Sequence, residues 1–396
     1  MPRDEERIGR IQQVLSSNNW NALVCTLPEN VLLLSGYWPV IGSSVAMFQR
    51  EGAAILLVPD DERELAQQGW ADEIRTFESG SLSDLKTTSE SACEALGEIR
   101  DQLRLPAASI LGFEGSSSFE PSSYASNFGF GAEIQTVLGR VFPVATLVDA
   151  AEHLNRLRSA ATSRELGLIR RACHIARNAF VTTSASIEAG MREWDIAALL
   201  RSNLGAAQTD DTRCDGFAYC MSGPNSAQAF AAFQHTRSRA VKEGDFILLH
   251  CNSYCGGLWT DITRTFCIRP PDSHAAIIDA VLEASQKAIS VIRPGITAAA
   301  VDDASRGVLT ARGYGKAFRN ATGHGVGFAA INHNAPPRIH PLSQEVLESG
   351  MVFNVEPAVY IPGVGGMRQC NMVAVNEGGV ELLTPFQNLK SELILK

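Results

Sequence analysis

The sequence predicts two domains, an α/β domain over residues 1–155 and an α+β domain over 156–396. Helix-like and strand-like segments alternate in the first part, whereas capped helices followed by pairs of strand-like segments fill the second. Only His153 of the eight His precedes residue 160, so most of the candidate chemistry lies in the second part. A chain of 396 residues is long enough for two or three domains of about 150 residues each.

Composition excludes several classes of protein. Hydrophobic residues make up 45% and charged residues 19%, as in an ordinary folded protein. The net charge of −9 argues against binding to nucleic acid or to an anionic membrane surface. No apolar run reaches the roughly 18 residues of a membrane span, and the charged N-terminus lacks the apolar core of a secretory signal. Nine Cys without regular spacing favour reduced thiols, so we expect a cytoplasmic protein.

The first domain has the pattern of an α/β unit. Ile8, Ile11 and Leu15 follow helical spacing, and the apolar runs 22–27 and 53–59 are typical of buried strands. No glycine-rich phosphate-binding loop follows any of these runs. We therefore expect little catalytic chemistry in this domain.

The second domain begins with a helix and continues with strand pairs. Thr162 followed by Glu165 forms a capping-box pattern that predicts a helix to about residue 183. Further helices are predicted from about Arg192, over 272–292 and from Thr297. Strand-like segments are expected at 245–252, 259–268, 351–360 and 368–376.

Ligand-type side chains occur once or twice in each of four short segments. Alternation along 259–265 places Asp261 and Thr263 on one face of a strand and Arg264 on the other. A buried carboxylate or imidazole is costly unless it is paired or coordinated. Pairing with Arg264 or Arg368 and ordinary core packing are the alternatives to a functional site. The candidate residues are His250, Asp261, His324, Glu356, Arg368 and Cys370.

Four segments resemble the signature segments of a known family. TDITRTF (260–266), RPGIT (293–297), GHGVG (323–327) and FNVEP (353–357) are similar to those of the pita-bread family. This family contains methionine aminopeptidase, aminopeptidase P, prolidase and creatinase. The first domain also resembles the N-terminal domain of the aminopeptidase P, prolidase and creatinase branch. The resemblance implies a creatinase-type α/β domain over 1–155, a pita-bread domain over 156–396, and a homodimer.

The resemblance implies a metal site, with two departures. The family's metallopeptidases hold two divalent ions with Asp, Asp, His, Glu and Glu. Asp261, His324 and Glu356 match three of these ligands, but His250 replaces the first Asp and Cys370 replaces the last Glu. The N/S ligand set suits zinc or iron better than manganese. We therefore expect one tetrahedral ion held by Asp261, His324, Glu356 and Cys370, with His250 as a fifth ligand or a base.

Other family positions differ as well. The upstream catalytic His of the family falls at Phe233 when counted back from the Gly–Asp pair, or at Phe230 when counted forward from Asn225, and His235 lies nearby. His333 matches the family's later active-site His and would donate a hydrogen bond to an oxyanion. Arg368, Trp259 and Phe233 are candidates for binding substrate, and Arg368 could instead hold Asp261.

Three functions follow from this resemblance. The first is a hydrolase of a C–N bond in small peptides or amides, similar to aminopeptidase P and prolidase. The second is a metal-independent hydrolase like creatinase or ectoine hydrolase, in which Asp261 or Glu356 acts as nucleophile or base and His250, His324 or His333 moves protons. The third is a binding protein without catalysis. The retained Asp261, His324 and Glu356 favour a hydrolase.

Overall fold

The computed structural model describes residues 2–40, 43–103, 105–106, 108–115, 130–206, 212–230, 235–329 and 331–396. The chain forms two compact units. The first extends to Arg158 and includes Thr162–Arg164, and the second comprises Ser159–Ala161 and Glu165–Lys396. Among the described residues, no helix is long and apolar enough to cross a membrane.

The first unit contains a six-stranded mixed sheet with the strand order β4-β3-β2-β1-β5-β6. The pairs β3–β4, β1–β5 and β5–β6 are parallel, and β1–β2 and β2–β3 are antiparallel. The expected strands at 22–27 and 53–59 are present as β1 and β3. The strands are β1 (Ala22–Cys25), β2 (Val45–Gln49), β3 (Ala54–Pro59), β4 (Glu73–Phe77), β5 (Ile110–Phe113) and β6 (Thr146–Asp149).

Helices pack on this sheet through alternating apolar side chains. Val24, Met47 and Leu57 point to the face that packs against Leu96 and Leu138 of α4 and α5. Because successive strand residues face opposite sides, this face forms one continuous apolar layer. The helices of the unit are α1 (Glu5–Ser17), α2 (Pro28–Ser35), α3 (Arg63–Ala66), α4 (Thr88–Gln102), α5 (Phe130–Val141) and α6 (Ala151–Ser159), with a 3₁₀ turn at Asp60–Glu62.

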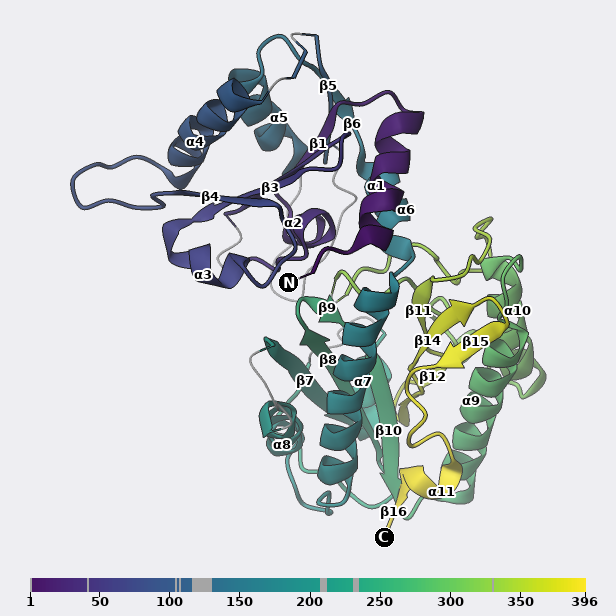
Figure 1. The fold of residues 1–396 in the computed structure, drawn as a ribbon. Helices are drawn as coiled ribbons and strands as arrows, with labels where there is room; N and C mark the ends of the chain where they lie inside the picture. Colours follow the sequence, from purple (N-terminus) through teal and green to yellow (C-terminus); the bar gives the residue numbers. More distant parts are fainter. Residues whose placement is uncertain are drawn as a thin grey trace. The chain divides into compact units, whose positions relative to one another are not determined.

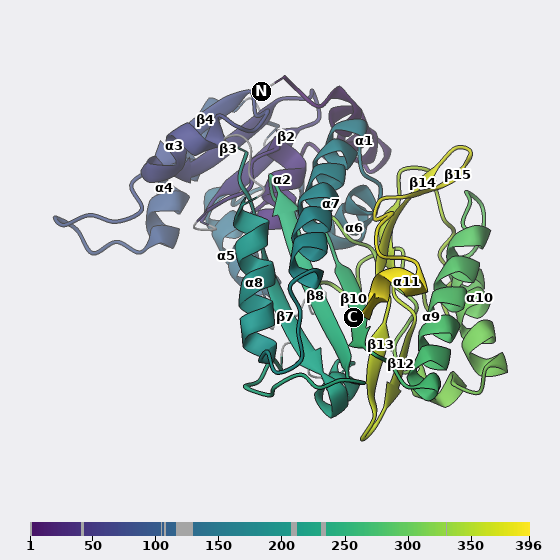
Figure 2. The ribbon, with the colours of Figure 1, turned by 90° about the horizontal axis from the view of Figure 1, so that it is seen from below.

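The helices of the second unit begin where the sequence predicts them. The Thr297 side chain accepts a hydrogen bond from the Ala300 N–H at the start of α10. Helices α7 and α8 lie over one face of the sheet that contains β7, β8 and β10, and α9 and α10 pack beside the remaining strands (Figures 1 and 2). The helices are α7 (Ser163–Ser184), α8 (Glu193–Ala206), α9 (Asp272–Val291), α10 (Ala298–Ala311) and α11 (Lys390–Leu393), with 3₁₀ turns at Gly223–Gln228 and Gly315–Ala317.

The strands of the second unit form three sheets. One has the order β16-β10-β8-β7 with β9 paired to β8, another has the order β11-β14-β15, and β12 pairs with β13. The strands are β7 (Cys214–Ser222), β8 (Phe246–Cys255), β9 (Leu258–Trp259), β10 (Ile262–Ile268), β11 (Val352–Val355), β12 (Ala358–Ile361), β13 (Gly365–Arg368), β14 (Asn371–Asn376), β15 (Gly379–Leu382) and β16 (Ile394–Leu395).

The segment 351–360 is two strands rather than the single one that was expected. β11 ends at Val355 and pairs with β14, and β12 begins at Ala358 and pairs with β13. Pro357 has no backbone N–H to donate to a ladder, so the pairing is interrupted at Glu356–Pro357. The chain therefore changes sheets at this point.

The cysteines depart in one place from the expected reduced state. Cys214 and Cys255 are directly opposite in the β7–β8 pair and form a disulfide. Seven other Cys are free thiols, and Cys370 is one of them. The irregular spacing of the Cys residues does not indicate this pair, because the two residues meet only through the register of two strands.

Candidate metal centre and active site

Three of the expected ligands lie where one strand ends and the next begins. Asp261 lies between β9 and β10, Glu356 between β11 and β12, and Cys370 between β13 and β14. They are 3%, 7% and 0% exposed, respectively. One potential ligand atom from each residue lies within 4.8 Å of those from the other two. The strand interruptions thus bring side chains from separate sheets to one point.

His324 reaches the same point from the loop before β11. Its Nε2 lies 3.7 Å from Asp261 Oδ2 and 3.9 Å from Glu356 Oε1. The Asn354 carboxamide accepts a hydrogen bond from the His324 backbone N–H at 2.7 Å. His324 is 3% exposed, so the loop holds a buried imidazole beside two carboxyl groups.

The glycine before His324 is required by close packing. A Cβ atom on Gly323 would lie 1.9 Å from the Asn354 backbone oxygen. We expect Gly323→Ala to lower the free energy of unfolding by about 2–4 kcal/mol, because the backbone must shift to remove this overlap. Gly307 within α10 has open space around it, so Gly307→Ala should instead stabilise the protein by about 0.5–1 kcal/mol. Urea unfolding of both variants checks this; equal effects would contradict it.

The spacing of Asp261, Glu356 and Cys370 suits a single ion, and His324 lies within 4 Å of both carboxylates. Metal–ligand distances of about 2.0–2.3 Å give ligand–ligand separations of about 3.3–3.8 Å. Cys370 Sγ lies 3.4 Å from Asp261 Oδ1, close to the 3.7 and 3.9 Å separations from His324 to the carboxylates. Two carboxylates, one imidazole and one thiol are donor types that zinc and iron accept.

His250 lies beside this group but is bonded elsewhere. Its Nε2 is 3.8 Å from Asp261 Oδ1 and makes a hydrogen bond of 2.9 Å to Asn252 Oδ1. Its Nδ1 is 2.8 Å from Thr263 Oγ1, and the ring stacks on Tyr219 with centroids 4.5 Å apart. Both ring nitrogens therefore have hydrogen-bond partners within the protein.

Arg368 supplies a buried positive charge next to the candidate ligands. It donates to Thr263 Oγ1 at 3.0 Å and to His250 Nδ1 at 3.1 Å. Its Nη1 lies 3.8 Å from Glu356 Oε2, and its Nη2 donates to the Tyr219 hydroxyl at 3.3 Å. Its closest carboxylate contact is thus with Glu356 and not with Asp261.

Burial and charge set the protonation of the site without an ion. Burial raises the pKa of Glu356 to about 8 and raises the pKa of the Cys370 thiol well above its usual value. Burial opposes ionisation of Asp261, but the attraction of His250, His324 and Arg368 outweighs it and lowers its pKa. Glu356 and Cys370 are therefore protonated at neutral pH, and both protons must leave when a cation binds.

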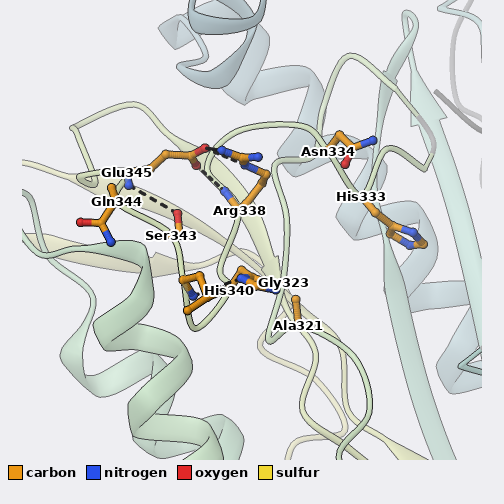
Figure 3. A pocket seen from close by; sticks show the side chains of 10 residues that line it. Ala321, Gly323, His333, Asn334, Arg338, His340, Ser343, Gln344 and Glu345 are labelled. Carbon is orange, nitrogen blue, oxygen red and sulfur yellow. Dashed lines mark hydrogen bonds and ion pairs between the residues drawn. The ribbon is translucent and has the colours of Figure 1, made fainter. Parts of the chain in front are cut away.

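His333 contacts the site and also lines a cavity, which the candidate ligands themselves do not line. Its ring meets the ring of His324 edge to face, with centroids 4.9 Å apart. The cavity has a volume of about 640 Å³, within the usual range for small-molecule sites of about 300–1,000 Å³. Figure 3 shows His333 on one side of it and the ion pair of Arg338 and Glu345 on the other. A small substrate in this cavity would have His333 beside it.

Two of the predicted residues are not part of this cluster. His235 is exposed, and its described contact is with the Arg237 guanidinium at 2.9 Å. Trp259 packs between Phe217 and Tyr254, with centroids 5.2 and 4.5 Å away, so its side chain belongs to the hairpin core. Phe233 lies outside the residues that the structure describes.

Sequence reasoning missed two polar residues that hold the histidines. Asn252 binds His250, and Asn354 binds His324. Each is buried, and each lies two residues from a candidate ligand. Polar side chains at these alternating positions in apolar strands were the signal that could have identified them.

Two sequence models of protein families match this chain. Residues 167–377 match "Metallopeptidase family M24", and residues 7–160 match "Creatinase/Prolidase N-terminal domain". The first match covers more than half of the chain. The family's metallopeptidases use divalent metal, as the expected ligand set requires.

Individual relatives agree with these matches. The Xaa-Pro dipeptidase of Pyrococcus furiosus is 28% identical over 385 residues, which cover 96% of this chain and 98% of the relative. The uncharacterized peptidase YqhT of Bacillus subtilis is 30% identical over 275 residues, which cover 69% of this chain and 72% of the relative. The crystal structure of the prolidase from Pyrococcus horikoshii OT3 superposes with a TM-score of 0.74 at 25% identity, over 96% of this chain and 98% of that one.

These matches confirm the fold predicted from the sequence, a creatinase-type α/β domain followed by a pita-bread domain. They also confirm a hydrolase of the peptidase type. The chain belongs to metallopeptidase family M24.

Proposed function

We propose that this chain hydrolyses the C–N bond of Xaa-Pro dipeptides with one divalent ion, zinc or iron, held by Asp261, His324, Glu356 and Cys370. The convergence of Asp261, Glu356 and Cys370 carries the proposal, together with His324, whose Nε2 lies 3.7 and 3.9 Å from the two carboxylates. His250 lies at the position of a fifth ligand, but its two ring nitrogens are bonded to protein groups. The Xaa-Pro specificity rests on the name of the relative that matches along 98% of its length.

Residues around the ion would also contribute to catalysis. Asp261, His324, Glu356 and Cys370 would hold the ion, which would supply Lewis-acid chemistry for a scissile carbonyl and for water. His333, at the edge of the cavity, donates a hydrogen bond to the developing oxyanion of the substrate. Arg368 places a fixed positive charge next to Glu356 and orients a negatively charged group of the substrate.

Metal analysis combined with a substrate panel tests the proposal. We expect about one zinc or iron per chain in protein purified without chelator, and faster hydrolysis of Leu-Pro than of Leu-Ala. Two ions per chain would contradict the single site. Absence of metal together with hydrolysis of creatine would favour the metal-independent mechanism instead. Metal-free protein that is inert on all these compounds would favour a binding protein.

The Cys370 thiol gives a direct test of its role as a ligand. A thiolate bound to zinc is protected, so Cys370 should react with a thiol probe at least about tenfold faster after chelation. Labelling is followed by peptide mass spectrometry. Cys173, which is also buried and free, serves as the internal control and should show no such change. Because the metal-free thiol is itself 0% exposed, zinc binding by Cys370→Ala is measured as well, and a variant that still binds one zinc per chain would exclude Cys370 as a ligand.

We also propose that the enzyme acts on small peptides in the cytoplasm as a homodimer. Seven free thiols among nine Cys support a reducing compartment. The family resemblance supports the dimer. Sedimentation analysis should give twice the mass of one chain; a monomer would contradict this part of the proposal.

A further inference from the structure

Two buried histidines lie near the Asp261 carboxylate, each facing a different one of its two oxygens. His250 Nε2 lies 3.8 Å from Asp261 Oδ1, and His324 Nε2 lies 3.7 Å from Asp261 Oδ2. Distance therefore does not decide which imidazole binds a cation. The hydrogen bonds of the two rings do, because a neutral imidazole carries its proton on only one nitrogen.

The partners of His324 leave its Nε2 without a proton. Nδ1 lies 3.0 Å from the Gly325 carbonyl oxygen, which only accepts, so Nδ1 carries the proton. Asn354 Oδ1 accepts from the His324 backbone N–H, so the atom 3.2 Å from Nε2 is the Asn354 amide nitrogen, which donates. Because the proton is on Nδ1 and the Asn354 amide donates to Nε2, Nε2 has a free lone pair for accepting.

The partners of His250 require the opposite tautomer. Its Nδ1 accepts from Arg368 at 3.1 Å, and a guanidinium group has no lone pair to offer in return. The proton is therefore on Nε2, which faces Asn252 Oδ1 at 2.9 Å. The orientation of Asn252 is fixed independently, because its amide nitrogen donates to the Thr260 carbonyl oxygen at 3.0 Å.

We infer that Asn252 and Asn354 act as positioning residues that hold the two histidines in opposite tautomers, so that His324 offers its Nε2 lone pair to a cation and His250 binds Arg368 instead. This inference deepens the proposed function and rests on its single ion. Arg368 then provides, beside Glu356, a permanent positive charge that a second ion would otherwise supply. The Asn354 amide occupies the His324 lone pair with a single hydrogen bond, which an entering ion displaces.

Nitrogen-15 NMR of histidine-labelled, metal-free full-length protein tests the tautomers directly. His324 should show a protonated Nδ1 and an unprotonated Nε2, and His250 the reverse. On addition of zinc, the Nε2 resonance of His324 should shift and those of His250 should not. The same tautomer in both rings, or coordination of zinc by His250, would overturn the inference. This first measurement requires neither activity nor metal, so it is independent of the proposed function.

Matched substitutions test the consequence for metal binding. His324→Asn should weaken zinc binding by at least about a hundredfold, whereas His250→Asn should change it by less than about tenfold. Asn354→Leu should weaken zinc binding by about 10- to 100-fold while the number of ions stays at one. Zinc dissociation constants are measured by competition with a chromogenic chelator, and folding is checked by circular dichroism. Equal losses in the two histidine variants would overturn the inference.

Discussion

Glu356→Gln is expected to lower kcat/KM by at least about a thousandfold and to leave the protein without its divalent ion. A carboxamide has nearly the same size as a carboxyl group but is a poor ligand. In the metal-free site, burial raises the pKa of Glu356 to about 8, so the side chain is already neutral at pH 7. The metal-free variant should therefore fold as the wild type does. Elemental analysis and steady-state kinetics measure the two losses.

A second carboxylate provides the control for this variant. Glu381 in β15 is bonded to Arg170 at the surface and lies in the same unit. Glu381→Gln should leave both the ion and kcat/KM within about twofold of the wild type. A Glu356→Gln protein that keeps its ion and its rate would exclude Glu356 as a ligand and would remove the main support for a metal site.

Arg264→Leu should lower the free energy of unfolding of the second unit by about 3–5 kcal/mol, and Tm by about 10 °C. Arg264 is 0% exposed, and its guanidinium is bonded only to neutral oxygens. Leucine would fill part of the space but would leave these buried acceptors without donors. The acceptors are the backbone oxygens of Thr263, Cys370, Thr384 and Phe386 and the side-chain oxygen of Asn371.

A surface arginine, Arg170, provides the comparison for the loss of stability. Arg170 binds Glu381 with two hydrogen bonds, but about half of its side chain is exposed. Arg170→Leu should cost less than about 1 kcal/mol. Thermal and urea unfolding of both variants measures the difference. A loss below 1 kcal/mol for Arg264→Leu would mean that water or a shifted backbone group satisfies the acceptors.

Local signals in the sequence were sufficient for most helices and strands. The pattern at Thr162 and Glu165 predicted α7, and Thr297 predicted α10, because a helix start depends on residues close in sequence. Alternation placed Asp261 and Thr263 on one strand face, and Thr263 does face His250 at the site. Such features depend on contacts within a few residues, and these can be predicted from the sequence.

The hydrogen bonds of the site could not be predicted in the same way. Arg264 was considered as a partner for Asp261, but it contacts backbone oxygens from Phe386 and Thr384 in a distant segment. The Arg368–His250 contact joins residues that are 118 positions apart. These pairings depend on how three sheets pack together, and no short sequence pattern predicts that packing.

The placement of Asp261, Glu356 and Cys370 between strands also bears on how this scaffold can change over time. At these positions the side chain contributes little to the strand ladders on either side, because the ladders are made by the neighbouring residues. A substitution at one of these positions changes the donor atom offered to an ion, while the three sheets keep their register. A thiol can therefore stand in place of a carboxylate through the exchange of one residue, and a redesign of the metal preference can begin at the same three positions.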